Sequence, residues 1–331
     1  MTEPASAATA EPGLATVIAS PLASRIRDEK TRTGVVRQIV DALVGRGHRD
    51  VAVVEASTPA AVRGVAEDAL RDRSSLIVLA GGDGTVRDAA GVLAGHETTV
   101  GIVPCGTGNL YAVSCGVPRS TEAAIAALRT GAPRSFDIAE VSLVGEAAPA
   151  GPANAAPARI PDSSPFMVAC GTGLDARLIE GTSADMKRRY GIAAYFFAAA
   201  GLLPHLRANP TVLTIDGVRT ELESVVVLVA NCGEAIPGRL RPRLPLDPAD
   251  GLLHVFVLPR SGVVHGIRGV LELMTSQATG ISPSGSALRL AGSSVRVEVT
   301  PAQPTEIDGD PFPPATIDAR IRPGTLSLLV A

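Results

Sequence analysis

Two glycine-rich segments, each placed directly after a short apolar run, constrain the fold of this 331-residue chain more than any other feature. Residues 76–80 are apolar and lead into the segment GGDGT at 81–85. Residues 100–103 are also apolar and lead into PCGTGN at 104–109. A continuous apolar run of this kind is typical of a strand that is buried on both faces of a parallel sheet. We therefore predict two parallel strands that each end in a glycine turn at the same edge of an α/β sheet.

A strand that passes through glycines into a helix presents bare backbone N–H groups at the start of that helix. The N-terminus of such a helix is a favourable place for a phosphate group. Glycine suits the turn because a Cβ atom would hold the phosphate away from the backbone and restrict its dihedral angles. Two such turns side by side predict a nucleotide site at the carboxyl ends of the strands. A glycine turn without any ligand is the alternative interpretation.

The residues of the two turns are also those of a known family. The segment GGDGT, followed about twenty residues later by P-x-GTGN-x-x-A, resembles the diacylglycerol kinase catalytic superfamily, which includes bacterial lipid kinases and sphingosine kinases. GGDGT alone also occurs in NAD kinases and phosphofructokinase-like enzymes, so the second segment is what favours the lipid kinases. Further similar segments follow in the family's order, namely GTGLDA at 171–176, NCG at 231–233, DGLL at 250–253 and DGD at 308–310.

The resemblance implies two domains. After a disordered tail at residues 1–13, we expect an α/β nucleotide-binding domain at 14–133, in which a NAD kinase-like parallel sheet carries helices on both faces. We expect a β-rich, sandwich-like domain for the lipid substrate and the metal at 134–331, because short strands alternate with turns there. A flexible loop rich in Ala and Pro is predicted at 145–165. The main predicted helices lie at 33–46, 60–71 and 121–130, and the later strands at 211–215, 224–231, 252–258, 294–300, 320–322 and 326–330.

The resemblance also implies which residues hold ATP. Thr58 falls near a nucleotide-contacting Thr of the family, although it is equally well explained as the N-cap of the helix at 60–71. The loop that begins at Ser20-Pro21, called the first loop below, departs from the family, which usually has Asn-Pro there. Its serine hydroxyls and Arg25 are candidates for phosphate contacts. The full predicted ATP-binding set is Gly81, Gly82, Asp83, Gly84, Thr85, Gly106, Thr107, Gly108, Asn109 and Thr58.

Two Asp-Gly turns supply candidate carboxylates for phosphoryl transfer, which requires charge neutralisation and an oriented acceptor hydroxyl. In the first turn, the resemblance implies that Asp250, Asp247 and the carbonyl of Leu252 hold Mg²⁺, which prefers oxygen ligands. Taken alone, an Asp-Gly pair is a hairpin turn, which is the alternative for both segments.

In the second turn, the resemblance implies that Asp310 is the catalytic base that accepts the proton of the lipid hydroxyl. The family usually has Glu at this place, and Asp reaches less far by roughly 1.5 Å, the length of one C–C bond. Asp83 and Asp308 are expected in the network of Mg²⁺ and water around the phosphates.

An apolar run at 192–203 follows the basic residues at 187–189. It is shorter than the roughly 18–20 residues that a membrane span requires. Two interpretations stay open: a buried core helix, or the wall of an apolar groove that accepts acyl chains near anionic headgroups.

Composition and charge limit the kinds of binding partner, and the compartment, that we expect. The net charge of −3 without a long basic run makes nucleic acid an unexpected partner. Four cysteines without C-x-x-C spacing and a polar first segment predict a reduced, cytoplasmic protein that meets its lipid substrate at the inner face of the membrane. Exposed sheet edges could pair two copies into a homodimer.

We therefore predict a transferase, an ATP- and Mg²⁺-dependent lipid kinase of phospholipid metabolism, which phosphorylates a hydroxyl of diacylglycerol or a related lipid alcohol. The alternatives are a kinase of a soluble acceptor, as in NAD kinases, and a non-catalytic member that binds nucleotide or lipid. A dehydrogenase is disfavoured because no G-x-G-x-x-G opens a βαβ unit.

Overall fold

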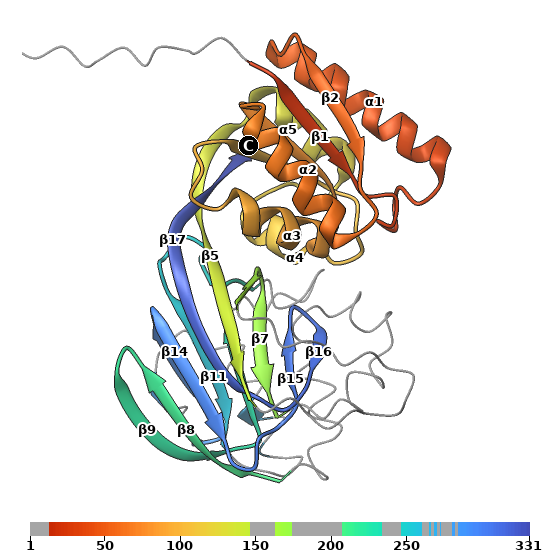
Figure 1. The fold of residues 1–331 in the computed structure, drawn as a ribbon. Coiled ribbons are helices and arrows are strands. Elements are labelled where there is room, and N and C mark those ends of the chain that lie inside the picture. Colours follow the sequence, from red (N-terminus) through yellow and green to blue (C-terminus); the bar gives the residue numbers. More distant parts are fainter. Residues whose placement is uncertain are drawn as a thin grey trace, which may run out of the picture. The chain divides into compact units, whose positions relative to one another are not determined.

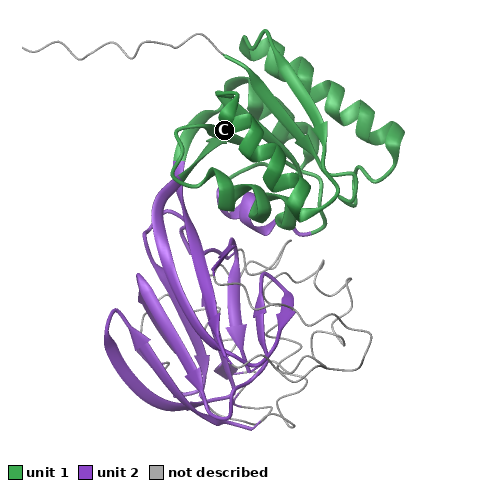
Figure 2. Cartoon of the chain, viewed as in Figure 1, with its two compact units in different colours: residues 1–107, 116–134, 326–331 green, residues 108–115, 135–325 purple. Residues whose placement is uncertain are grey.

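A computed structural model, drawn in Figure 1, gives the fold. It describes residues 13–145, 163–173, 207–233, 246–259, 265, 268–269, 272, 280–281 and 284–331. The chain divides into two compact units (Figure 2). The first unit holds Met1–Thr107, Gly116–Arg134 and Leu326–Ala331, and the second holds Gly108–Cys115 and Ser135–Thr325.

The sheet of the first unit is parallel, in the order β2-β1-β3-β4-β17. Val17 of β1 lies opposite Val53 of β2 and Val78 of β3, and the end of β17 joins β4 by the pair Leu328–Val100. The strands are β1 (Ala15–Ala19), β2 (Val51–Glu55), β3 (Leu76–Gly81), β4 (Thr99–Pro104) and β17 (Thr316–Val330). Both predicted strands before the glycine turns are therefore present and parallel.

Helices cover both faces of this sheet, as predicted. The helices are α1 (Glu29–Arg46), α2 (Pro59–Arg71), α3 (Asp83–Leu93) and α5 (Thr121–Thr130). The helices α1 and α5 pack on each other and bury Leu43 and Leu128 against Val17 and Val78. The helices α2 and α3 pack on each other and contact β1 and β3. Because apolar side chains are covered on both faces, β1 and β3 are buried along their whole length.

Local capping decides where these helices begin. The helix α1 starts four residues before the predicted Thr33, because the Asp28 carboxylate accepts a hydrogen bond from the Thr31 N–H at 2.9 Å. It ends at Gly47, whose left-handed φ of 110° lets its N–H reach the last carbonyl groups of the helix. Thr58 caps α2 as predicted, since its hydroxyl accepts from the Ala61 N–H at 3.2 Å.

The second unit consists of two antiparallel layers that share one core. One layer contains β17 with β14 (Ser294–Val299), β8 (Asn209–Ile215), β9 (Val218–Ser224), β5 (Ala132–Val144) and β6 (Ser164–Phe166). The other has the order β12-β13-β11-β10-β7-β15-β16. Its strands are β12 (Gly280–Ile281), β13 (Leu288–Gly292), β11 (Leu253–Leu258), β10 (Val226–Ala230), β7 (Ala169–Thr172), β15 (Thr305–Ile307) and β16 (Asp310–Phe312). Val295 and Ile317 of the first layer join Val227 and Val255 of the second in one buried cluster, so the unit is a β-sandwich. The short helix α4 (Leu110–Ser114) belongs to this unit.

Two of the three Asp-Gly turns are hairpin turns. Asp216-Gly217 joins β8 to β9, and Asp308-Gly309 joins β15 to β16, with positive φ at all four residues. Two consecutive left-handed residues define the type I′ turn, which matches the twist of the strands. At Asp250-Gly251 only the glycine has a positive φ, of 74°, and the turn precedes β11 without forming a hairpin.

The end of the chain differs from the prediction. The two short strands predicted at 320–322 and 326–330 are one strand, β17. It continues through Pro323 and Gly324, and the Gly324 N–H donates to the Asp137 carboxylate at 2.7 Å instead of to a strand partner. Leu328 of this strand pairs with Val100 of β4, and residues 326–331 belong to the first unit, whereas the sequence assigned all of 134–331 to the second domain.

Several predicted features lie outside the described residues: the tail at 1–12, most of the loop at 145–165, residues 174–176 of the GTGLDA segment, and the apolar run at 192–203 with its basic neighbours. None of the helices in the described ranges is long and apolar enough to cross a membrane.

Candidate functional site

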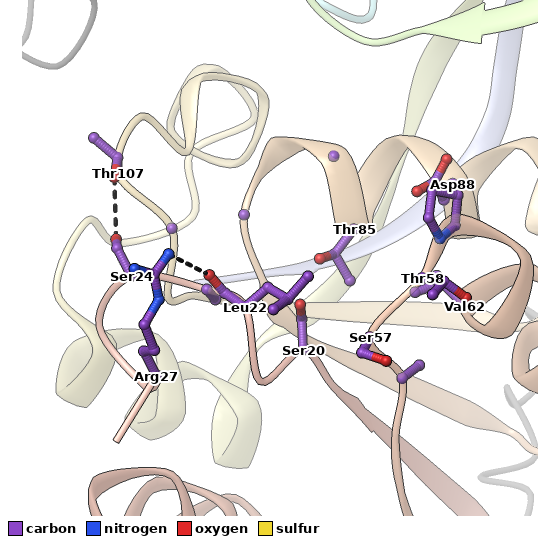
Figure 3. A pocket seen from close by; sticks show the side chains of 16 residues that line it. Ser20, Leu22, Ser24, Arg27, Ser57, Thr58, Val62, Thr85, Asp88 and Thr107 are labelled. Atoms are coloured by element: carbon purple, nitrogen blue, oxygen red, sulfur yellow. Dashed lines mark hydrogen bonds between the residues drawn. The ribbon is translucent and has the colours of Figure 1, made fainter. Parts of the chain in front are cut away.

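A pocket of about 350 Å³ lies in the first unit, at the carboxyl ends of four parallel strands (Figure 3). Each strand contributes the segment that directly follows it: β1 residues 20–27, β2 residues 56–59, β3 residues 82–85 and β4 residues 106–107. The lining includes six residues of the predicted ATP-binding set, namely Thr58, Gly82, Gly84, Thr85, Gly106 and Thr107. Parallel strands all end at one edge of the sheet, which is why segments distant in sequence meet there.

The two glycine turns are packed backbone to backbone. The Cys105 N–H donates to the Gly81 carbonyl at 2.9 Å. A Cβ atom on Gly82 would lie 3.2 Å from the Cα atom of Gly106, which is tighter than ordinary packing. A Cβ atom on Gly81 would lie 2.5 Å from the Thr85 side chain. The contact between the turns therefore favours glycine at position 82, the packing of Thr85 requires it at position 81, and both leave bare backbone beside the pocket.

The start of α3 is suited to an anion. Gly82 is its N-cap. Because glycine has no side chain, the N-cap residue does not accept a side-chain hydrogen bond from the first N–H groups of the helix. Gly84 and Thr85, in the first turn, line the pocket. The first N–H groups of an α-helix have no partner within the helix, and together with the helix dipole they give its start a partial positive charge. This end of the helix can accept a phosphate group.

The first loop is held against the second glycine turn. Ser24 Oγ and Thr107 Oγ1 are 3.1 Å apart and hydrogen-bonded, as Figure 3 shows. The guanidinium group of Arg25 donates to the carbonyl groups of Pro104 and Arg119 at 3.4 and 3.0 Å. Arg25 does not line the pocket; it lines a second cavity of about 430 Å³ beside α5. The structure thus gives Arg25 a supporting contact to the turn instead of the predicted phosphate contact.

Four other members of the predicted set do not line the pocket. Gly81 is the last residue of β3, and Asp83 is the first residue of α3. Gly108 and Asn109 belong to the second unit, where Asn109 is buried with a left-handed φ of 51° at the start of α4. These residues shape the two turns, and only six of the ten predicted residues come together around the pocket.

The carboxylate of Asp308 holds a neighbouring loop. Its oxygens accept hydrogen bonds from the backbone N–H groups of Met167, Val168 and Ala169 at 3.0, 2.9 and 3.2 Å. Asp310 lies two residues further on β16, opposite Ile307, and is exposed. Asp308 is therefore a structural group of the hairpin, whereas Asp310 is the carboxylate that solvent and a substrate can reach.

The predicted metal ligands are engaged in local hydrogen bonds. Asp250 Oδ1 accepts from the Leu252 N–H, and Asp250 Oδ2 lies beside His254 Nε2, both at 2.9 Å. Asp247 Oδ1 accepts from the Ala249 N–H at 3.1 Å. Across the described part of the chain, no three His, Cys, Asp or Glu side chains are grouped to hold a metal ion. In this arrangement Asp247 and Asp250 do not form a ready-made magnesium site.

Asp137 is a buried carboxylate that the sequence reasoning missed. Its two oxygens accept from the N–H groups of Gly251 and Gly324, each at 2.7 Å. Its backbone N–H donates to the Pro248 carbonyl at 2.8 Å. Asp137 thus holds the turn that carries the predicted metal ligands. The available signal was the presence of two acidic residues, Asp137 and Glu140, within the apolar alternation of the strand at 134–144.

Two buried thiols have perturbed acidity. Burial raises the pKa of Cys105, between the glycine turns, to about 11, against a weaker opposing effect of Arg25. Burial also raises the pKa of Cys170 well above its usual value, and the carboxylates of Glu306 and Asp308 add to the effect. Both cysteines are therefore neutral, packed groups at physiological pH and not nucleophiles.

Comparison with known proteins places the chain in a family. Residues 15–141 match the diacylglycerol kinase catalytic domain, and residues 168–330 match the YegS C-terminal NAD kinase beta sandwich-like domain. A protein of Pseudomonas savastanoi pv. phaseolicola named "Probable lipid kinase YegS-like" is 31% identical over 76% of this chain and 74% of its own length. The chain belongs to the diacylglycerol kinase catalytic superfamily.

A further protein and two solved structures are similar to the chain. An uncharacterized protein of Synechocystis, sll0036, is 25% identical over 77% of this chain, which spans about half (54%) of that protein's length. A crystal structure of a diacylglycerol kinase from Bacillus anthracis str. Sterne has the same fold, with a TM-score of 0.66 at 19% identity and 97% of both chains covered. Another crystal structure from the same organism has a TM-score of 0.72 at 21% identity.

Proposed function

We propose that this member of the superfamily is an ATP-dependent lipid kinase that transfers the γ-phosphate to a hydroxyl of diacylglycerol or a related lipid alcohol. The pocket at the carboxyl ends of β1–β4 is the observation that carries the proposal, because it gathers two glycine turns, a helix N-terminus and hydroxyl side chains. The family supports the lipid acceptor.

In this proposal the pocket binds the phosphates of ATP. The first N–H groups of α3, beside Gly82 and Gly84, donate hydrogen bonds to the phosphate oxygens, and so do the Thr85 and Thr107 hydroxyls. Thr58 contributes at the pocket wall in addition to capping α2. Phosphoryl transfer requires little covalent chemistry from the protein, so holding the phosphates in place is the main contribution.

Asp310 is the proposed base. Its exposed carboxylate accepts the proton of the lipid hydroxyl as the hydroxyl oxygen attacks phosphorus. Asp308 fixes the hairpin from which Asp310 projects, through its three backbone hydrogen bonds. Mg²⁺ is proposed as the ion that neutralises the nucleotide phosphates, as the family resemblance implies.

The experiment is a phosphotransfer assay with purified protein, ATP and Mg²⁺. Diacylglycerol, monoacylglycerol, phosphatidylglycerol, a sphingoid base and NAD⁺ serve as separate acceptors, and co-sedimentation with vesicles reports membrane association. We expect one lipid to be phosphorylated, and we expect Asp310→Ala to lower turnover by about 10²–10⁴ while ATP binding persists. Transfer to NAD⁺ alone would favour a soluble acceptor. ATP binding without transfer to any acceptor would favour a non-catalytic binding protein.

A further inference from the structure

The pocket is rich in hydroxyl groups and has little charge. Its hydroxyl-bearing lining residues are Ser20, Ser24, Ser57, Thr58, Thr85 and Thr107. Among the described residues that line it, Arg27 alone is positively charged, and Asp88 alone is negatively charged. A polyphosphate carries several negative charges, so the one cationic side chain at its site has a large influence on affinity.

The charge of Asp88 is already compensated. Its side chain is 14% exposed and lies 3.6 Å from the guanidinium group of Arg63. Arg63 does not line the pocket. The carboxylate on the pocket wall therefore opposes an incoming anion only weakly, and Arg27 is not needed to neutralise it.

Arg27, by contrast, forms no ion pair with any of the described residues. Its Nη2 atom donates to the Leu22 carbonyl at 3.5 Å, which is a long and weak hydrogen bond, as Figure 3 shows. The neighbouring arginines are occupied, since Arg25 donates to two carbonyl groups and Arg32 pairs with Glu55 at 2.7 Å. Arg27 thus has most of its donors available at the edge of the pocket.

The loop after β1 holds Arg27 in this position. The Ser20 N–H donates to the Ala80 carbonyl, and two successive turns follow, in which Ala23 donates to Ser20 and Ile26 donates to Ala23. Ile26 is fully buried, which anchors the loop immediately before Arg27. Backbone contacts and burial therefore fix where the guanidinium group can reach.

We propose that Arg27 binds the phosphate chain of the nucleotide and sets how strongly the pocket prefers nucleoside triphosphates over monophosphates. This proposal rests on the proposed nucleotide site. The other residues of this loop that line the pocket, among them Ser20 and Ser24, are neutral and supply no charge. Arg27 supplies it. A planar guanidinium group suits this role because it donates two parallel hydrogen bonds to phosphate oxygens.

The test compares the affinities of ATP, ADP and AMP by calorimetry at low and high salt, for the wild type and three variants. Arg27→Gln removes the charge, and Arg27→Lys restores it without the planar fork. Lys30→Gln removes one charge from a nearby exposed residue that does not line the pocket. Because Arg27 is exposed, its replacement leaves the fold intact, and the melting temperature of each variant checks this.

For Arg27→Gln we expect about tenfold weaker ATP binding at low salt, as is typical of one lost hydrogen bond to a charged group. The ADP affinity falls less, the AMP affinity changes by less than about twofold, and high salt narrows the difference from wild type. Arg27→Lys recovers part of the affinity, and Lys30→Gln behaves as wild type. Equal effects of Arg27→Gln and Lys30→Gln, or an equal loss for AMP and ATP, would overturn the role of Arg27. A wild type that binds no nucleotide would overturn the nucleotide site itself.

Discussion

Replacing Asp137 tests how the second unit holds the turn at 247–252. Asp137 is 2% exposed, and its carboxylate accepts hydrogen bonds from the N–H groups of Gly251 and Gly324, which lie 114 and 187 residues away in sequence. A hydrogen bond to a charged group contributes about 1.5–3 kcal/mol. Gly324 is exposed, so water can satisfy its N–H when the carboxylate is lost. We therefore expect Asp137→Ala to lower the free energy of unfolding by about 2–4 kcal/mol.

Asp137→Asn separates the two hydrogen bonds. The amide keeps one acceptor oxygen but turns an NH₂ group toward the other glycine N–H, so we expect about half the loss seen for alanine. Urea unfolding, followed by circular dichroism, measures both variants. The matched control is Asp318→Ala in the same unit, because Asp318 pairs with Arg296 at 3.1 Å and is 45% exposed. An exposed pair of this kind contributes about 0–1 kcal/mol.

A different result would refute this reasoning. If Asp137→Ala and Asp318→Ala shift the urea midpoint equally, the two hydrogen bonds of Asp137 contribute nothing beyond an exposed ion pair. If Asp137→Asn equals the wild type, the charge of the carboxylate is unimportant.

Three further predictions concern single side chains. Asp308→Ala should lower the urea midpoint, because three backbone N–H groups lose their acceptor. Asp310→Ala should keep the midpoint and lower turnover by about 10²–10⁴. The opposite pattern would contradict both assignments. Burial raises the pKa of the Cys105 thiol to about 11, so the folded protein favours the protonated thiol. This contribution to stability is complete below pH 9 and is lost as the pH rises toward 11. Unfolding of the wild type should therefore become easier over this range by about 2–3 kcal/mol more than that of Cys105→Ala, and equal slopes would contradict it. Gly34→Ala should stabilise the protein by about 0.4–1 kcal/mol, since a Cβ there meets nothing within 4 Å in the middle of α1, and a lower melting temperature would count against this packing.

Local sequence signals predicted the parts of the fold that depend on near neighbours. Apolar runs located β3 and β4, and the glycine turns that follow these strands lie at one pocket, because parallel strands end at one edge. The same signals missed β9, whose sequence VRTELES is polar because most of the strand is exposed at the edge of its sheet. They also missed β15 and β16, which are too short to show a period.

The roles of individual polar residues depend on distant partners and were harder to predict. Asp308 was expected among metal and water, but the loop that it holds lies about 140 residues earlier in the chain. Arg25 and Arg27 both follow the first strand, and only the path of the loop shows that Arg27 lines the pocket while Arg25 supports the turn. Nothing in the sequence pattern distinguishes the two.

The central claim is that the pocket between the two glycine turns holds ATP, and calorimetric titration of ATP into three proteins tests it most directly. The proteins are the wild type, Gly82→Ala, whose new Cβ would lie 3.2 Å from the Gly106 Cα, and Gly34→Ala, whose Cβ meets nothing within 4 Å. We predict that the wild type and Gly34→Ala bind ATP alike, and that Gly82→Ala binds at least about tenfold more weakly because its Cβ forces apart the two glycine turns that line the pocket. ATP binding by Gly82→Ala with wild-type affinity would contradict the claim.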